Sequence, residues 1–267
     1  MLQRLAFETL CESSAEEKVR LTFSLQGYIE QLQAGELEEL FQLSLEEECP
    51  GLPSSVILVS PDQVPRRRLG SLHGCAAMLH AVAHIEFNAI NLALDVVCRF
   101  AGMPKAFYLD WCRVAVEEAY HFSLVSDRLA ELGFNYGDFP AHHGLWEMAL
   151  KTKSDPLARM AMVPRLLEAR GLDVTPGLQA RMLAAGEKKG AGILDIIFRD
   201  EVGHVRVGNY WFRWLCKSRG LDPLEIFRVY LPLYSAPKHR GEMNLEARLS
   251  AGFDQDDINV LLAYSNA

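Results

Sequence analysis

The chain has 267 residues, of which 49% are hydrophobic and 23% charged, and its formal net charge is −8. This length and balance suit one large globular domain, or one domain with an extension, and they exclude wholesale disorder. The acidic excess argues against broad binding to nucleic acid, although it leaves room for a local basic patch.

The compartment is indicated by what the sequence lacks. The N-terminus shows no charged segment followed by an apolar one, as a secretory signal would, and no apolar run reaches the roughly 18 residues of a membrane span. Six scattered cysteines form no Cys-x-x-Cys pair, which favours buried thiols over disulfides or a zinc ribbon. We therefore expect a cytoplasmic protein with no membrane partner.

The first 69 residues are expected to form an N-terminal extension. Residues 1–48 have the periodicity of two or three helices with polar faces, and residues 49–69 form an extended connector punctuated by prolines. The connector contains the basic run Arg66-Arg67-Arg68. We interpret this run as a solvated loop; an RNA-binding surface is the alternative, but no aromatic residues interleave with it for stacking.

Two long helices are predicted next. The first runs over residues 71–101 and stops at Gly102-Met103-Pro104, and the second runs over residues 105–132 and ends at Gly133. Glycine followed by proline is a common stop signal for a helix. The segment after Gly133 is rich in turn-forming and aromatic residues, so we expect a loop there.

Two more helices complete the predicted core. The third covers residues 144–170, with a break near Pro156 and a kink or a new start at Pro164. The fourth begins after Pro176 and runs to Ser218, and the glycines within it could divide it in two. Beyond it we expect a C-terminal extension with a short helix followed by another helical stretch.

The second and the fourth predicted helices each contain Glu-x-x-His, as Glu118/His121 and Glu201/His204. Residues i and i+3 share one face of a helix, so each pair could bind one metal ion or support a bridged pair of ions. Both pairs interrupt apolar stripes that face the core. A buried carboxylate needs a partner or a metal, because burying it alone is costly.

The other two helices supply further candidate ligands. Glu86 lies on the most apolar face of the first helix, and Glu168 lies near the end of the third. Glu147 and Glu187 are alternatives to Glu168, because Pro164 makes the phase of that helix uncertain.

The spacing of these residues predicts a topology. Glu86 and Glu118 are 32 residues apart, Glu168 and Glu201 are 33 apart, and a 50-residue gap separates Glu118 from Glu168. Two helical hairpins joined by a long crossover form the ferritin-like bundle. We therefore predict an all-α fold, with a four-helix bundle over residues 70–220, an extension over residues 1–69 and another over residues 221–267, together forming one compact unit.

Several stretches support a family resemblance: HIEFNAINLALD, EEAYHF, YGDFPAHHGLW, EARGLDVTP and DEVGHV. They resemble a bacterial family of uncharacterised ferritin-like proteins in the di-iron carboxylate superfamily, which is similar in turn to the tRNA-modifying di-iron hydroxylases. The resemblance covers residues 70–220 well. Its metal motifs are specific for a site and not for a reaction.

The resemblance implies two metal ions and a role for each candidate ligand. Glu118 and Glu201 would bridge or chelate both ions, and each ion would take one nitrogen. The glutamates that cap one ion each would be Glu86 and Glu168, and the nitrogens would come from His121 and His204. Mixed oxygen and nitrogen ligation suits iron, with manganese and zinc as alternatives.

Four further residues could support these ligands. Glu117 and Asp200 each precede a candidate glutamate and could orient a histidine of a partner helix, or they could simply be exposed. Tyr120 could lie near the metals or be a structural tyrosine. His84 lies about 200° around the helix from Glu86, which favours helix packing over metal binding.

Three functions remain open from the sequence. The first is an O₂-activating di-iron oxygenase or hydroxylase with an unidentified small-molecule substrate; a tRNA hydroxylase is a version that the acidic charge disfavours. The second is a ferroxidase or metal-handling protein, although the two extensions disfavour a ferritin cage and favour a monomer or homodimer. The third is a non-catalytic scaffold that a metal stabilises.

Overall fold

The structure is a computed structural model that describes residues 2–34, 50–64 and 69–267. These residues are helical, and their one β-type contact is an isolated bridge between Leu58 and Ala141. The all-α prediction is thus confirmed for the described part of the chain. Arg66-Arg67-Arg68 lies outside the described residues, as does the end of the predicted N-terminal helical region.

The chain divides into two compact units. Unit 1 comprises Met1–Gly144 and Arg181–Ile193, and unit 2 comprises Leu145–Ala180 and Leu194–Ala267. The boundaries fall within helices, away from the segment limits that we predict near residues 69 and 220. Each unit is described by itself below.

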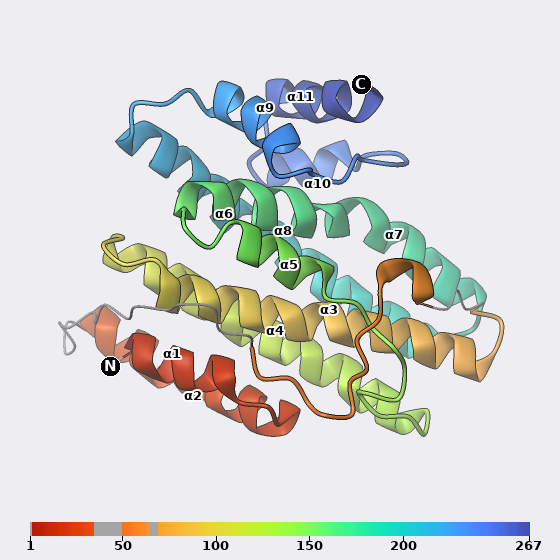
Figure 1. The fold of residues 1–267 in the computed structure, drawn as a ribbon. Coiled ribbons are helices and arrows are strands. Elements are labelled where there is room, and N and C mark those ends of the chain that lie inside the picture. Colours follow the sequence, from red (N-terminus) through yellow and green to blue (C-terminus); the bar gives the residue numbers. More distant parts are fainter. Residues whose placement is uncertain (1, 35–49, 65–68) are drawn as a thin grey trace. The chain divides into compact units, whose positions relative to one another are not determined.

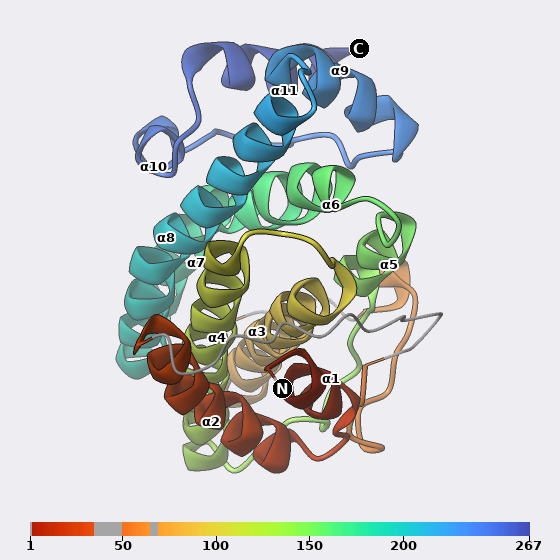
Figure 2. The same ribbon diagram turned by 90° about the vertical axis from the view of Figure 1, so that its left-hand side faces the viewer.

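Unit 1 is built mainly from two helical hairpins. Its elements are α1 (Leu2–Cys11), α2 (Ala15–Ala34), the short 3₁₀ turn η1 (Pro61–Gln63), α3 (Leu72–Arg99) and α4 (Lys105–Glu131). α3 packs along α4, while α1 packs against α3 and α2 against α4 (Figures 1 and 2). The helices predicted over residues 71–101 and 105–132 are confirmed to within two residues at each end.

α3 is the central helix of unit 1. Ser71 caps its N-terminus by accepting a hydrogen bond from the Gly74 amide at 3.1 Å. By length and composition α3 could cross a membrane, but 89% of its most apolar window is buried inside the structure. The core helix of a globular protein can be equally apolar. The high hydropathy of α3 arises because buried apolar side chains lie around nearly its whole circumference.

Lys18 joins the α1–α2 hairpin to α3 through hydrogen bonds. Its fully buried ammonium donates hydrogen bonds to the carbonyl oxygens of Leu10 at 3.0 Å and Gly51 at 2.8 Å, and to Oδ1 of Asn91 at 2.5 Å. Gly51 must be glycine, because a Cβ there would lie 2.2 Å from the carbonyl oxygen of Glu12. Burial lowers the pKa of Lys18 to about 7.

Unit 2 contains most of the chain after Gly144. Its elements, some of which begin or end in unit 1, are α5 (Gly144–Lys151), α6 (Pro156–Met162), the π-helical segment η2 (Val163–Glu168), α7 (Ala169–Ala184), α8 (Lys188–Ser218), α9 (Pro223–Leu233), α10 (Leu245–Ser250) and α11 (Gln255–Asn266). α9 packs against α6 and α11, and Figure 1 shows α9, α10 and α11 gathered near the C-terminus. The predicted helical tail is confirmed.

Two predicted boundaries are wrong, because α7 continues through Gly171 and Pro176 to Ala184. Proline has no amide hydrogen, so Pro176 leaves the carbonyl of Leu172 without its helical donor. The side-chain amide of Asn244 donates to that carbonyl instead, at 3.3 Å. A residue 72 positions away thus preserves a helix that local sequence signals predict to end.

The predicted division at a glycine is confirmed, because the helix breaks at Gly186, which adopts a left-handed φ of +82°. The Gly186 amide donates to the Leu183 carbonyl at 3.0 Å, and the Glu187 amide donates to the Met182 carbonyl at 2.9 Å. This pattern closes a helix C-terminus and favours glycine at the turn. The fourth predicted helix therefore begins at Lys188.

The described cysteines are mostly buried thiols, as the sequence predicts. Cys11 is exposed, none of the described cysteines forms a disulfide, and four are buried: Cys75, Cys98, Cys112 and Cys216. Burial raises the pKa of Cys112 to about 12 and that of Cys216 to about 11. The thiolate is the reactive form, so these two side chains are poor nucleophiles.

Candidate metal centre

Three of the candidate ligands meet in unit 1. Glu86 comes from α3, and Glu118 and His121 come from α4. Nδ1 of His121 lies 3.4 Å from Oε2 of Glu86 and 3.3 Å from Oε2 of Glu118. The residues are 4%, 1% and 0% exposed, in chain order. We call Glu86, Glu118 and His121 the trio.

The electrostatics of the trio suit a cation. Burial by itself lowers the pKa of His121, but hydrogen bonds and charges from Glu118 and Glu86 outweigh it and raise that pKa to about 11. One imidazolium beside two carboxylates leaves the trio with a formal charge of −1. A divalent cation would neutralise both carboxylates and take neutral imidazole as a donor. Two carboxylates and one imidazole fit iron, manganese or zinc.

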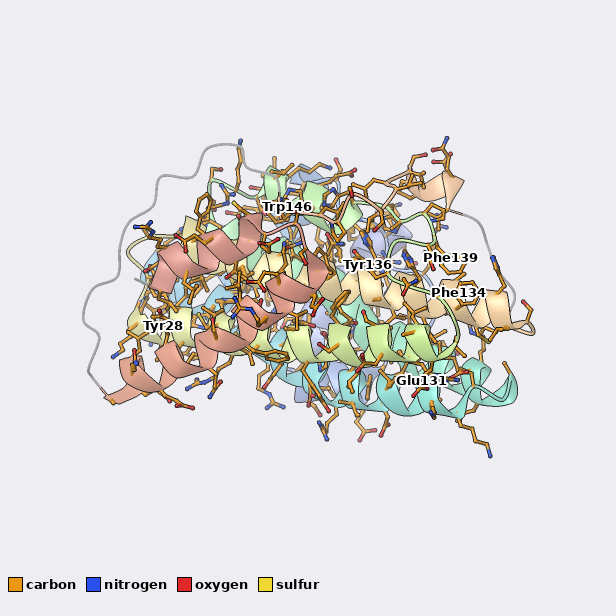
Figure 3. The ribbon with its side chains drawn as sticks, turned by 90° about the horizontal axis from the view of Figure 1, so that it is seen from below. Tyr28, Glu131, Phe134, Tyr136, Phe139 and Trp146 are labelled. Atoms are coloured by element: carbon orange, nitrogen blue, oxygen red, sulfur yellow. The ribbon has the colours of Figure 1, made fainter. Side chains whose placement is uncertain are left out.

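Aromatic rings fill the α3–α4 interface next to the trio. Phe87 and Phe122 directly follow Glu86 and His121 in sequence, and their ring centroids are 5.3 Å apart. The ring of Tyr136 lies 5.3 Å from Phe87 and 5.1 Å from Phe122. Figure 3 labels Tyr136 with two other aromatic residues of the loop after α4. The periodicity of α4 predicts that Phe122 faces the core, whereas Phe87 and Tyr136 are not among the predicted residues; the signal for Phe87 was an aromatic residue directly after a candidate ligand.

His84 binds this loop and not the trio. Its Nδ1 lies 2.8 Å from the hydroxyl of Tyr136, and its Nε2 lies 3.0 Å from the carbonyl oxygen of His142. Burial lowers the pKa of His84 to about 4, so the ring is neutral near pH 7. This placement fits the packing role that its position on the helix favours.

The other two supporting candidates on α4 lie toward solvent. Glu117 is exposed, and Tyr120 is 44% exposed. The ring centroid of Tyr120 lies 6.3 Å from that of His121. Tyr120 is therefore beside a candidate ligand, whereas the position of Glu117 fits the alternative of plain exposure.

The other three candidate ligands lie in unit 2. Oε1 of Glu201 and Nδ1 of His204 are 3.4 Å apart on α8, and their side chains are 14% and 2% exposed. Glu168 is the half-buried last residue of η2. Asp200 pairs with its neighbour Arg199 at 2.9 Å.

Within unit 1, the described residues Glu86, Glu118 and His121 belong to a group that could hold a metal ion. The buried glutamates and histidine support the prediction of a metal ion, whereas the number of ions and their identity stay predictions.

The alternatives to Glu168 have other positions. Glu187 accepts two hydrogen bonds from the guanidinium of Arg128, at 2.8 and 2.7 Å, and this pairing lowers its pKa. Glu147 is exposed on α5. Neither side chain thus offers a buried carboxylate that awaits a cation.

The backbone that carries Glu168 is π-helical. Pro164 cannot donate the hydrogen bond that α6 would need to continue, and its ring crowds the preceding turn. A Cβ at Gly208 of α8 would lie 2.4 Å from Cβ of Pro164, so glycine makes room for the proline. The sequence predicts a kink or a helix start here; the structure instead has the wider turn, which often occurs at functional sites.

Comparisons with known proteins place the chain in a family. The model of a family described as "Protein of unknown function (DUF455)" matches residues 11–259. The chain belongs to the DUF455 family. A protein of Haemophilus influenzae described as an "Uncharacterized protein" is 46% identical over 255 residues, which cover 92% of this chain and 88% of that relative. No solved structure matches significantly. The description of DUF455 assigns no activity, so the chemistry of the candidate ligands must carry the function.

Proposed function

We propose that this DUF455 protein is a dinuclear metal protein of the ferritin-like di-iron carboxylate type that activates O₂ to oxidise a small-molecule substrate. The observation that carries the proposal is the trio in unit 1. It buries two carboxylates and an imidazole within hydrogen-bonding reach of one another. A divalent cation offsets the cost of burying both charges.

The Glu201/His204 pair on α8 supports the second ion. It repeats the i, i+3 arrangement of Glu118/His121, with nearly the same carboxylate–imidazole distance, 3.4 Å against 3.3 Å. In the proposed centre, Glu118 would hold metal together with Glu86 and His121, and Glu201 and His204 would hold it together with Glu168.

The residues of the chain would hold and shield the centre. Iron, when bound there, supplies the electrons that O₂ reduction needs. Glu86 and His121 would hold one ion from two different helices, so the register between α3 and α4 keeps these two ligands together. Phe87 and Phe122, which follow two of these ligands in sequence and are 0% and 4% exposed, make the interface of α3 and α4 apolar.

The test is anaerobic reconstitution with Fe(II), followed by metal analysis and then by exposure to O₂ with Mössbauer spectroscopy. We expect two iron ions per chain and an antiferromagnetically coupled diferric product. Glu118→Gln should lose iron, whereas the adjacent, exposed Glu117→Gln should retain it. Fewer than one ion per chain in the wild type would refute the proposal.

Two further outcomes of the same experiment would replace the proposed activity. Continued turnover of added Fe(II) with release of Fe(III) would identify a ferroxidase. A bound pair of ions that consumes no O₂ would identify a metal-stabilised scaffold.

A further inference from the structure

We propose that Arg165 is a positioning residue for Glu168, and that α11, through its contact with Arg165, sets the occupancy of the metal ion that Glu168 binds. This inference rests on the proposed function, because it treats Glu168 as a metal ligand. All of its structural observations lie within unit 2. It gives a role to a C-terminal helix that carries no candidate ligand.

Arg165 is the most enclosed charge of the η2 segment. Its side chain is fully buried, forms an ion pair with Asp257 of α11 and donates a hydrogen bond to Oδ1 of Asn209 on α8. Three aromatic rings surround the guanidinium, with centroids 4.5–4.8 Å from its central carbon: Phe212, Phe227 and Phe253. Such contacts, made from three directions, fix the side chain and the backbone that carries it.

The contact between η2 and α8 lies about one helical turn from the proposed ligand on each of these two elements. Pro164 precedes Glu168 by four residues, and Gly208, which makes room for Pro164, follows His204 by four residues. Asn209, the partner of Arg165, also donates to the Ala251 carbonyl at 2.8 Å. The Pro164–Gly208 and Arg165–Asn209 contacts therefore set how η2 crosses α8.

A role in stability alone does not explain this choice of residue. A buried ion pair is often no more stabilising than well-packed apolar side chains of the same volume. In the proposed role, the ion pair between Arg165 and Asp257 favours one of the helical registers that are open to a π-helical segment. Shifting η2 by one residue would turn Glu168 to a different face of this element. The pairing of Arg165 with Asp257 selects a single register and so a single direction for Glu168.

The test is a double-mutant cycle in the full chain, read out by anaerobic Co(II) titration with visible absorption. It compares wild type, Glu168→Gln, the paired variant Arg165→Met/Asp257→Leu, and the triple variant. Removing both charges leaves neither of them buried alone, and Arg213, which also pairs with Asp257 at 2.6 Å, keeps Asp254 as a partner at 2.8 Å. We expect Glu168→Gln and the paired variant each to weaken binding of one of two Co(II) ions by roughly 10–100-fold. The triple variant should bind within about threefold of Glu168→Gln, because the two changes remove the same interaction.

The matched control is the other buried arginine–aspartate pair of unit 2. Arg248 and Asp173 join α10 to α7, and their side chains are 2% and 3% exposed. Arg248→Met/Asp173→Leu should lower the unfolding midpoint about as much as the first pair, yet leave Co(II) affinity within about threefold of wild type. Equal losses of affinity in the two paired variants would overturn the positioning role.

Other results separate this inference from the proposed function. Effects that multiply in the triple variant, or wild-type affinity in the Arg165/Asp257 variant, would overturn the inference alone. A wild-type chain that binds no Co(II) would remove the proposed function as well. Should circular dichroism show the paired variant unfolded, Gly208→Ala replaces it in the cycle, because its new Cβ displaces Pro164 and the same non-additivity with Glu168→Gln is expected.

Discussion

Replacing Lys18 with methionine should remove a pH dependence of stability that the fold of unit 1 creates. Lys18 is fully buried among three oxygen acceptors, and burial lowers its pKa from 10.5 to about 7. Each pKa unit corresponds to about 1.36 kcal/mol, so this shift of 3.5 units corresponds to nearly 5 kcal/mol at most. That figure is an upper bound on how far protonation of this one group can change the free energy of unfolding.

The sign follows from where the proton binds. In the unfolded chain Lys18 keeps its proton up to about pH 10.5, whereas in the folded chain it loses the proton near pH 7. Between these values the unfolded state binds more protons, so the free energy of unfolding rises with pH. From pH 7 to pH 9 the rise due to Lys18 should be about 2–3 kcal/mol. Methionine carries no proton, so Lys18→Met loses this rise.

Urea unfolding at pH 7, 8 and 9, followed by circular dichroism, measures the effect. Lys18→Met should be less stable throughout, because Leu10, Gly51 and Asn91 lose a buried donor, at about 1–3 kcal/mol for an acceptor left unsatisfied. The difference between wild type and Lys18→Met should grow with pH, since all other titrating groups cancel in it.

The control is Lys189→Met, because that side chain is 67% exposed and pairs with Glu131 at the surface. Its difference from wild type should stay constant across the three pH values. Parallel pH profiles for wild type and Lys18→Met would show that the buried ammonium keeps an ordinary pKa, and the reasoning would be wrong.

Three further predictions concern the metal ligands, the helix crossing and the loop after α4. Glu118→Ala should abolish binding of at least one metal ion by elemental analysis, whereas Glu117→Ala should leave the metal content unchanged; equal metal content in the two would count against the trio. Gly208→Ala should lower the free energy of unfolding by about 1–3 kcal/mol, because its Cβ would lie 2.4 Å from a proline ring. On the same helix, Gly192→Ala meets nothing within 4 Å and should raise stability by up to about 1 kcal/mol in the same urea titration. Acidification from pH 6.5 to 4.5 should cost about 2–3 kcal/mol through His84, whose folded pKa of about 4 lies below its unfolded value of 6.5. His84→Gln should show a shallower loss of stability over that range, and an unchanged slope would contradict the neutral ring.

The boundaries of α3 and α4 were predictable because their signals are local. Ser71 caps the N-terminus of α3, and Gly102, with a positive φ of 74°, follows its C-terminus. α4 likewise starts right after Pro104 and ends just before Gly133, whose φ is +82°. Each signal acts within a few residues of the boundary, so neighbouring sequence is enough to place it.

The two prolines between residues 163 and 177 were not predictable in this way. Pro176 reads as a helix stop, yet α7 passes through it because Asn244 donates to the carbonyl that the proline leaves without a donor. Pro164 reads as a kink, yet it sits in a π-helical segment because Gly208 leaves space for its ring. Both outcomes depend on partners more than 40 residues away in sequence.

The same division holds for the candidate site. Spacing and burial pattern in the sequence were enough to select Glu86, Glu118 and His121, because i, i+3 pairs and apolar stripes are properties of single helices. The sequence could place Phe122 on the core-facing side of its helix, but it could not pair Phe122 with Phe87 or Glu187 with Arg128. The first pairing joins α3 to α4, and the second joins α4 to the turn before α8.

The sequence by itself determined that this chain is helical, where α3 and α4 begin and end, and which acidic residues interrupt apolar faces. Tertiary structure decided that His84 packs against Tyr136 and that α7 continues through Pro176. It also decided that Glu168 lies on a π-helical segment whose Arg165 is buried against α11. The reason is the range of the interactions. Helix capping and periodicity act within one or two turns, whereas a buried ion pair or a carbonyl without its helical donor is resolved by whichever distant side chain the fold brings near.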